Sequence, residues 1–438
     1  MKYKISKYCI EIENADDSVI LFNAVTGGIT RLETKIYNYI KTNSEIDCNL
    51  PYFELLKKEK YIVPYNQDEF KLLRYNELLA QQETNSLDTL TYVIAPTTAC
   101  NFRCVYCFEH EQNVIAKPTD AIIENIAKFI KNQCEKYPNI KKLIVTWFGG
   151  EPMLCFPEII KIGKILKESL SNLNIQLDSR IITNGVYLTK ERVKLLKENC
   201  NLSSAQITMD GLCEEYCKKK QCVASEYDKV ISNICAIWSE IDICIRLNVE
   251  RANLNDIYKL ADFLYDTLEL KNKISLYFAM LRDYSKGELK GIEFFTPIEY
   301  QIEKRKFYNY LAEKQYIVSN NDTKISVPFH KLIYCNLSRA QNFAIGPHGE
   351  LYKCEHHFGQ SDKVIGDVEN GIYYNNCFFE HACGINDKMC ANCNLYPVCQ
   401  TNCPEIHNLV IRKGDRCLRY MSVLESVKNV VKLYCRNA

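Results

Sequence analysis

The middle of the chain alternates short apolar runs with longer segments in which apolar residues recur every three or four positions. The short runs predict buried strands, and the longer segments predict amphipathic helices. The strand candidates are 92–95, 143–148, 180–183, 205–208, 244–249 and 274–279, and the helix candidates are 119–136, 157–172, 189–199, 226–240 and 254–269. Six β/α units predict a parallel sheet curved into a partial barrel. We expect functional residues at the carboxyl ends of its strands.

The first part of the chain has a different pattern. Short alternating runs predict strands at 9–13, 18–23 and 29–32, and helical spacing follows from Ile36. This pattern predicts a small α+β, winged-helix-like domain over residues 1–85, and the polar stretch 81–88 is predicted to be a linker. The barrel is expected over 90–283, a bridging region over 284–334, and a cysteine-rich domain over 335–438.

Length and charge limit the classes of protein that fit. A chain of 438 residues suggests two or three domains. The formal net charge is +1, and no basic stripe is present, so the sequence predicts no nucleic-acid partner and no anionic membrane surface. The amino-terminal residues lack a signal-peptide pattern, and no apolar run reaches about 20 residues, the length of a membrane span. We therefore expect a cytoplasmic protein.

The chain contains 23 cysteines. A disulfide framework does not fit a cytoplasmic protein, because the cytoplasm keeps thiols reduced. Metal binding is the better interpretation of so many thiols. Spacing singles out three cysteines after the first predicted barrel strand and seven near the carboxyl terminus.

The first group follows the apolar run at 91–96 and consists of Cys100, Cys104 and Cys107 in a C-x₃-C-x₂-C array. Three thiolates on one loop leave a cubic iron–sulfur cluster one ligand short, so that one iron is open to a small molecule. A zinc site or three unrelated buried thiols are the alternatives. The array, with Tyr106 just before its third cysteine, resembles the signature of the radical S-adenosylmethionine (SAM) enzymes.

The resemblance extends to later rim segments and implies a SAM site. In that family SAM chelates the open iron and is cleaved to a 5′-deoxyadenosyl radical. Carried over by position, the motifs that resemble the family's SAM contacts are Gly149-Gly150-Glu151, Asn184, Thr208, and the Arg246-x-Asn248 pair, with the Tyr106 backbone near the adenine. For Arg246 a structural role is an open alternative. We name no catalytic residue.

The segment after Gly211 departs from the family pattern. Cys213, Cys217 and Cys222 lie around the run Lys218-Lys-Lys220. Three thiols could be another cluster site, but they lack a fourth ligand. We therefore predict a solvated loop here.

The carboxyl-terminal cysteines are Cys335, Cys354, the run Cys390-x₂-Cys393-x₅-Cys399-x₃-Cys403, and Cys417. This spacing resembles the seven-cysteine pattern of the SPASM domain, which is found in peptide-modifying radical SAM enzymes. A zinc ribbon could use a Cys-x₂-Cys pair but would leave the other cysteines unexplained. The resemblance implies two auxiliary clusters, so that the chain would carry three [4Fe–4S] clusters with SAM. The outer cluster would be held by Cys390, Cys393, Cys399 and Cys417, and the inner one by Cys335, Cys354 and Cys403.

The inner cluster lacks a fourth ligand in this assignment. Cys377, Cys383, His356 or His357 could supply it. Alternatively the position is open and binds a substrate thiolate, which would suit thioether formation.

The resemblance implies a radical SAM/SPASM maturase that installs a crosslink, most simply a cysteine thioether, in a ribosomally made precursor peptide. The amino-terminal domain resembles leader-peptide recognition domains, which pair a strand edge with the leader. A packing extension that binds nothing is its alternative. An electron donor such as flavodoxin or ferredoxin is expected. Rival functions are carbon–carbon crosslinking, formylglycine formation by a sulfatase-type maturase, and a nonenzymatic electron carrier.

Overall fold

The structure is a computed structural model of the chain. It describes residues 2–13, 17–43, 45–85, 88–109, 116–283, 291–317, 327–332, 334–383, 387–399, 403–405, 412–413, 416–417 and 420–437. Within these residues, no helix is both long and apolar enough to span a bilayer.

The central element is a curved sheet whose first six strands are parallel, as the sequence predicts. These strands are β6 (Thr89–Ile94), β7 (Lys142–Trp147), β8 (Gln176–Thr183), β9 (Leu202–Thr208), β10 (Asp242–Val249) and β11 (Ser275–Met280). They neighbour one another in chain order, as successive crossovers of one hand require. The predicted α/β class and partial barrel are therefore confirmed.

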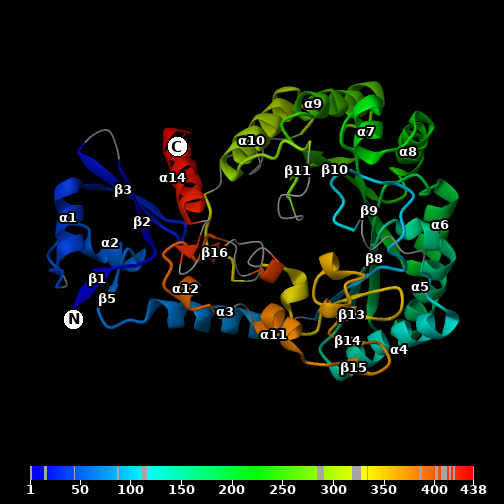
Figure 1. Ribbon diagram of the computed structural model, residues 1–438, viewed down its shortest axis with the longest axis horizontal. Coiled ribbons are helices and arrows are strands. Elements are labelled where there is room, and N and C mark those ends of the chain that lie inside the picture. The colour runs from blue at the N-terminus through cyan, green and yellow to red at the C-terminus, as the bar shows by residue number, and fades with distance from the viewer. Residues whose placement is uncertain are drawn as a thin grey trace.

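Helices cover the outer face of this sheet. They are α4 (Asp120–Lys136), α5 (Phe156–Ser171), α6 (Lys190–Cys200), α7 (Cys213–Lys220), α8 (Ala224–Ile237) and α9 (Leu254–Asp262), followed by a short π-helix, η3 (Phe263–Thr267). Figure 1 shows α4, α5, α6 and α8 along the outside of the arc. Thr119 and Thr189 begin α4 and α6 by accepting hydrogen bonds from the backbone N–H groups of Ile122 and Arg192.

Burial alternates along β6 and β7, so that every second side chain is fully enclosed. The enclosed residues, among them Tyr92, Val145 and Trp147, form one core with the covering helices. The intervening residues face the inside of the arc. This arrangement leaves the inner face available for a cavity at the carboxyl ends of the strands.

The sheet continues beyond the six predicted strands. β12 (Phe343–Ile345) pairs in parallel with β6, and β13 (Leu351–Tyr352) pairs antiparallel with β12. The Ala95 N–H donates to the Ile345 carbonyl at 2.9 Å, beside the start of the cysteine loop. The cysteine-rich region is thus joined to the barrel through its sheet.

The remaining elements of the second half are short apart from two helices. α10 (Pro297–Glu313) begins with a capping box between Thr296 and Glu299. After β13 come β14 (Gly366–Asp367), β15 (Gly371–Ile372), α11 (Asn376–Cys383), α12 (Lys388–Ala391), β16 (Arg412–Lys413), β17 (Arg416–Cys417) and the terminal helix α14 (Tyr420–Asn437). Single 3₁₀ turns are η2 (Pro152–Cys155), η5 (Asn336–Ser338), η6 (Glu355–His357) and η7 (Ser361–Lys363).

In its described residues, the amino-terminal module contains two small sheets and three helices. β2 (Cys9–Glu13), β3 (Ser18–Asn23) and β4 (Ile29–Glu33) form an antiparallel sheet in that order, and β1 (Tyr3–Ile5) pairs with β5 (Ile62–Pro64). The helices are α1 (Thr34–Thr42), α2 (Phe53–Lys58) and α3 (Glu69–Asn85). The prediction of a linker from residue 81 is wrong up to Asn85, because α3 continues through this polar stretch as a half-exposed helix.

The module packs against the carboxyl-terminal part of the chain. One hydrophobic cluster contains Ile10 and Phe22 from the small sheet, Tyr396 and Val398 from the cysteine-rich region, and Val431 from α14. Figure 1 shows α14 beside β2 and β3. The first and last segments of the chain therefore share a core.

Candidate active site

A cavity of about 500 Å³ opens at the carboxyl ends of the parallel strands. All three cysteines of the first array contribute to its wall. Seven of the eight residues expected at the SAM site also line it, namely Tyr106, Gly149, Gly150, Asn184, Thr208, Arg246 and Asn248. Residues that are far apart in the sequence therefore meet at the rim where chemistry is expected.

The cysteine loop is held in place by the end of helix α7. The backbone N–H groups of Arg103 and Val105 donate to the carbonyls of Lys220 and Lys219 at 3.2 and 3.0 Å. The Cys107 N–H donates to the Cys104 carbonyl at 3.0 Å, which closes a turn between two of the thiols. The loop thus keeps three sulfurs on one wall of the cavity.

The three thiols fit a metal cluster that displaces protons. Burial raises the pKa of Cys100 to about 12 and that of Cys107 to about 12, and it also raises the pKa of Cys104. Interactions among the three thiols add to the shift on Cys100 and Cys107. Iron binds thiolates and therefore releases these protons, so the donor set and its clustering fit an iron–sulfur cluster.

Two glycines let the end of β7 lie directly against the cysteine loop. A Cβ atom added to Gly149 would lie 2.2 Å from the Thr97 carbonyl oxygen, and one added to Gly150 would lie 2.3 Å from that of Ala99. Gly149 also has a φ of +119°, which favours glycine. Any side chain here would push the cysteine loop away from the strand.

Glu151 lies behind this wall instead of lining the cavity. Its carboxylate accepts hydrogen bonds from the backbone N–H groups of Met153 and Asn184, at 3.0 and 2.8 Å, and from the Thr183 hydroxyl at 2.7 Å. The residue ties the end of β7 to the end of β8. Its contact with SAM stays a prediction, and the structure gives it a structural role.

Polar side chains occupy alternate positions at the ends of β9 and β10. Gln206 and Thr208 line the cavity from β9, and Arg246 and Asn248 do so from β10. The Arg246 guanidinium donates through Nε to the Asn248 amide oxygen at 2.9 Å. The Asn184 amide donates to Asn101 on the cysteine loop at 2.8 Å. These side chains are positioned to bind a polar molecule in the cavity.

The prediction of a solvated loop around Lys218–Lys220 is wrong. This segment is helix α7, and Lys219 and Lys220 are buried. Ion pairs compensate the burial, because Lys219 contacts Glu250 and Lys220 lies 3.2 Å from the Asp210 carboxylate. The sequence alone does not show this burial, because the acidic partners Asp210 and Glu250 lie elsewhere in the chain, just after β9 and β10.

Lys220 is a site residue that the spacing of the sequence does not reveal. It donates to the Tyr106 hydroxyl at 2.7 Å, and Tyr106 also hydrogen-bonds to Asp210. Burial lowers the pKa of Lys220, but Asp210 and Cys104 outweigh that effect and hold the pKa above its usual value. A fixed positive charge therefore stands beside the cysteine loop.

The opposite wall of the cavity comes from β11 and the carboxyl-terminal region. Tyr277 and Met280 line it from β11, and Glu355 and His356 line it from the segment after Cys354. His356 stacks on Phe108, with ring centroids 4.0 Å apart. The cysteine-rich domain thus forms part of the same cavity.

Glu109 is a buried acid in this wall. Its burial, followed by the neighbouring Glu355, raises its pKa to about 8. The carboxyl group is therefore mostly protonated at neutral pH. No family spacing in the sequence singles this residue out.

Some of the carboxyl-terminal cysteines lie close enough to raise one another's pKa. Burial raises the pKa of Cys335 to about 11, and Cys403 contributes to that shift; Cys403 also contributes to the raised pKa of Cys354. In the other group, Cys417 contributes to the raised pKa of Cys393. The Cys399 N–H donates to the Leu395 carbonyl at 2.9 Å, beside the Cys390–Cys393 turn. Their ligand roles stay predictions.

Two of the candidates for a fourth ligand of the inner cluster have other contacts. His356 is stacked in the cavity wall, and His357 is hydrogen-bonded to Glu405. Cys383 is exposed and Cys377 is half-buried on α11. The identity of the fourth ligand stays open.

Residues 94–264 match the sequence profile of the Radical SAM superfamily. This range contains the cysteine loop and all the strand ends described above except that of β11. Among curated proteins, the chain is 27% identical to the radical SAM cyclopropyl synthase TigE of Paramaledivibacter caminithermalis, over 44% of this chain and 46% of that protein. The match therefore spans about half the length of this relative.

A second relative aligns over most of its length. The cysteine-type anaerobic sulfatase-maturating enzyme of Clostridium novyi is 24% identical over 79% of this chain and 97% of that protein.

Solved structures share the fold. A structure of anSMEcpe with bound AdoMet and the Cp18Cys peptide has a TM-score of 0.59 and 16% identity, covering 80% of this chain and 98% of that one. Streptococcus suis SuiB bound to the precursor peptide SuiA has a TM-score of 0.52 and 16% identity, covering 92% and 96%. These matches, together with the cysteine spacing, support a carboxyl-terminal domain of the SPASM type.

Proposed function

From the match of residues 94–264, which identifies the chain as a radical SAM superfamily enzyme, we propose that it modifies a ribosomally synthesised precursor peptide. The observation that carries the proposal is the single cavity that joins three thiols, a glycine turn and the polar strand ends to the cysteine-rich domain. Cys100, Cys104 and Cys107 would hold the [4Fe–4S] cluster. SAM would occupy the part of the cavity bordered by Gly149 and Gly150.

When bound, the cluster and SAM supply the reducing electron and the 5′-deoxyadenosyl radical that abstracts hydrogen from a substrate carbon. The protein binds SAM and the substrate, orients them, and excludes water from the cavity. Gly150 exposes backbone next to the cysteine loop, Asn184 and Thr208 offer hydrogen-bonding groups, and Arg246 offers a cation held by Asn248. Their convergence in one cavity suits a zwitterionic nucleoside.

The substrate would enter from the wall that β11 shares with the cysteine-rich domain. Tyr277 and Tyr300 provide aromatic surface there, and Glu109 and Glu355 provide acids. Relatives of this fold were solved with peptides, namely SuiB with SuiA and anSMEcpe with Cp18Cys. A peptide chain passing this wall would lie between the SAM site and the predicted inner auxiliary cluster of Cys335, Cys354 and Cys403.

We propose a cysteine thioether as the product, in which a bond joins a substrate sulfur to a substrate carbon and the thiol proton, one hydrogen atom and one electron are lost. Cys335, Cys354 and Cys403 would hold an auxiliary cluster that could supply the electron acceptor. Carbon–carbon crosslinking is the alternative within the same substrate class. Formylglycine formation is the second candidate function, and the 97% coverage of the Clostridium novyi enzyme favours it. Flavodoxin or ferredoxin would be the electron donor, in the cytoplasm.

The amino-terminal module has an exposed sheet edge that supports the binding of a leader peptide. In the described part of the chain, β4 is an edge strand that pairs with β3 alone. The Asn23 N–H donates to the Gly28 carbonyl at 2.9 Å, so the next pair, Phe22 with Ile29, is a non-hydrogen-bonded one. The Ile29 N–H therefore points away from β3. A leader strand could add to this edge.

A matched pair of variants tests leader binding. Ile29→Ala and Ile29→Pro both remove the side chain, but only proline removes the outward N–H, and an edge strand tolerates proline. The probe is the fluorescently labelled leader of a candidate precursor peptide, chosen from the short open reading frames next to the gene. Loss of one hydrogen bond predicts binding about 2- to 12-fold weaker for the proline variant than for the alanine variant. Equal affinities would contradict docking at this edge.

The product is tested by anaerobic incubation of the enzyme with SAM, a reductant and that peptide. A thioether removes two hydrogen atoms and one thiol that iodoacetamide could alkylate, whereas a carbon–carbon link leaves the thiol. Formylglycine gives an aldehyde that a hydrazide labels. SAM cleavage without any change to the peptide would refute the proposed substrate class.

A further inference from the structure

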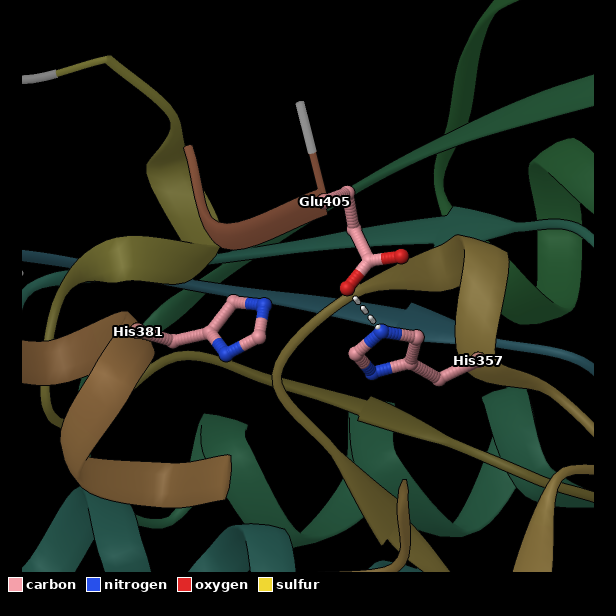
Figure 2. Close-up of side chains that lie close together, drawn as sticks. All are labelled: His357, His381 and Glu405. Atoms are coloured by element: carbon pink, nitrogen blue, oxygen red, sulfur yellow. Dashed lines mark hydrogen bonds and ion pairs between the residues drawn. The ribbon is translucent and has the colours of Figure 1, made fainter. Parts of the chain in front are cut away.

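Two histidines and a glutamate converge in the cysteine-rich domain, outside the lining of the SAM cavity. They are His357 in η6, His381 in α11 and Glu405. One ligand atom from each lies within 4.8 Å of those from the other two. Figure 2 shows the two rings on either side of the carboxylate, each with a nitrogen directed toward it.

His381 is oriented like a metal ligand. Its Nδ1 lies 2.9 Å from the Cys377 carbonyl oxygen, which can only accept, so Nδ1 carries the proton and Nε2 keeps a lone pair. The side chain is only 3% exposed, and its Nε2 is buried without a hydrogen-bond partner among the described residues. Figure 2 shows Nε2 on the side of the ring that faces Glu405 and His357.

His357 and Glu405 complete the group. His357 is fully buried, and its Nε2 lies 2.6 Å from the Glu405 carboxylate, to which it donates. The carboxylate brings a negative charge between two imidazoles. A cation could take the place of that hydrogen bond, with the His357 proton moving from Nε2 to Nδ1, and it would at the same time engage the lone pair on His381.

We propose that His357, His381 and Glu405 bind one divalent transition-metal ion of the zinc class, separate from the iron–sulfur clusters. Two imidazoles and one carboxylate are a known zinc donor set, and they leave a fourth position for water or another small ligand. Zinc bonds of about 2.0–2.2 Å place tetrahedral ligands roughly 3.4 Å apart, so ligand atoms that lie up to 4.8 Å apart need to approach each other by at most about 1.4 Å. The site contains no sulfur ligand, which distinguishes it from the cysteine groups.

A hydrogen-bonded cluster without metal explains the geometry less well. It leaves the His381 Nε2 without a partner, and an unsatisfied buried polar atom is destabilising. It also gives no reason for the second imidazole to face the same carboxylate. A bound cation accounts for both features.

The test is metal analysis of the full-length, cluster-loaded protein after incubation with Zn²⁺ and removal of loosely bound ions. We expect about one zinc per chain with a first shell of nitrogen and oxygen, seen by zinc X-ray absorption. His381→Gln and Glu405→Gln should lose that zinc and keep the iron content of the wild type. His348→Gln, at an exposed turn, is the matched control and should keep the zinc.

Three results would overturn the inference. They are wild-type protein that retains no zinc, a zinc shell that contains sulfur, and full zinc retention in His381→Gln. The wild-type absorption spectrum decides the question even if a variant fails to fold. None of these results bears on SAM cleavage, so the proposed function and this site are tested separately.

Discussion

Replacing Lys220 by methionine removes a buried charge beside the cysteine loop while keeping most of the side-chain volume. In the folded protein, Lys220 lies 3.2 Å from the Asp210 carboxylate and donates to the Tyr106 hydroxyl at 2.7 Å. The side chains of Lys220 and Asp210 are only 4% and 1% exposed. The variant therefore leaves Asp210 as a buried, uncompensated charge.

Removing one partner of a buried ion pair costs about 3–5 kcal/mol. For a folding unit of 150–250 residues, each kcal/mol lowers the melting temperature by about 2–4 °C, so the loss should be at least about 6 °C. Lys218→Met is the matched control, because Lys218 lies on the same helix, 73% exposed, in a surface pair with Glu215. That pair should contribute at most about 1 kcal/mol.

The assay is anaerobic thermal unfolding of the loaded enzyme, together with redox titration of the SAM-site cluster. Lys220→Met should melt lower than the control, and its cluster should have a lower reduction potential because a nearby positive charge is gone. The double variant Lys220→Met/Asp210→Asn should recover part of the stability, since no charge is then left unpaired. Melting of Lys220→Met at the wild-type temperature, with an unchanged potential, would refute this account.

Two further predictions concern the glycine turn and the auxiliary clusters. Gly150→Ala should strongly reduce SAM cleavage, because its Cβ would lie 2.3 Å from the Ala99 carbonyl oxygen and displace the cysteine loop. The rate of 5′-deoxyadenosine formation measures SAM cleavage, and a wild-type rate in this variant would contradict the close approach. Cys417→Ala should spare some SAM cleavage but stop peptide modification, because an auxiliary cluster loses a ligand. Mass spectrometry of the peptide checks it, and full product yield would contradict the assignment.

The barrel could be predicted from the sequence because its strands and helices are strongly periodic. The six strand candidates coincide with β6 to β11 to within a few residues at their ends. The added strands β12 and β13 have three and two residues, which is too short to leave a periodic signal. The end of α3 was missed for a related reason, because a half-exposed polar helix has few apolar positions to reveal it.

Residues of the candidate site could be predicted from the sequence where they belong to short motifs with a characteristic spacing. Cys100, Gly149 and Asn248 belong to short motifs and line one cavity. Lys220 and His381 do not, because their roles come from tertiary partners, Asp210 for the lysine, and His357 and Glu405 for the histidine. Such partners lie on other elements, and spacing along the chain does not show them.

The most direct test of the central claim is the iron and sulfide content of anaerobically reconstituted protein, measured with EPR and 5′-deoxyadenosine formation. The comparison is with a variant in which Cys100, Cys104 and Cys107 are all alanine. We expect about twelve irons per chain in the wild type and about eight in the variant, with SAM cleavage abolished. An unchanged iron content in the variant, or continued SAM cleavage, would contradict the assignment of the cavity as a radical SAM site.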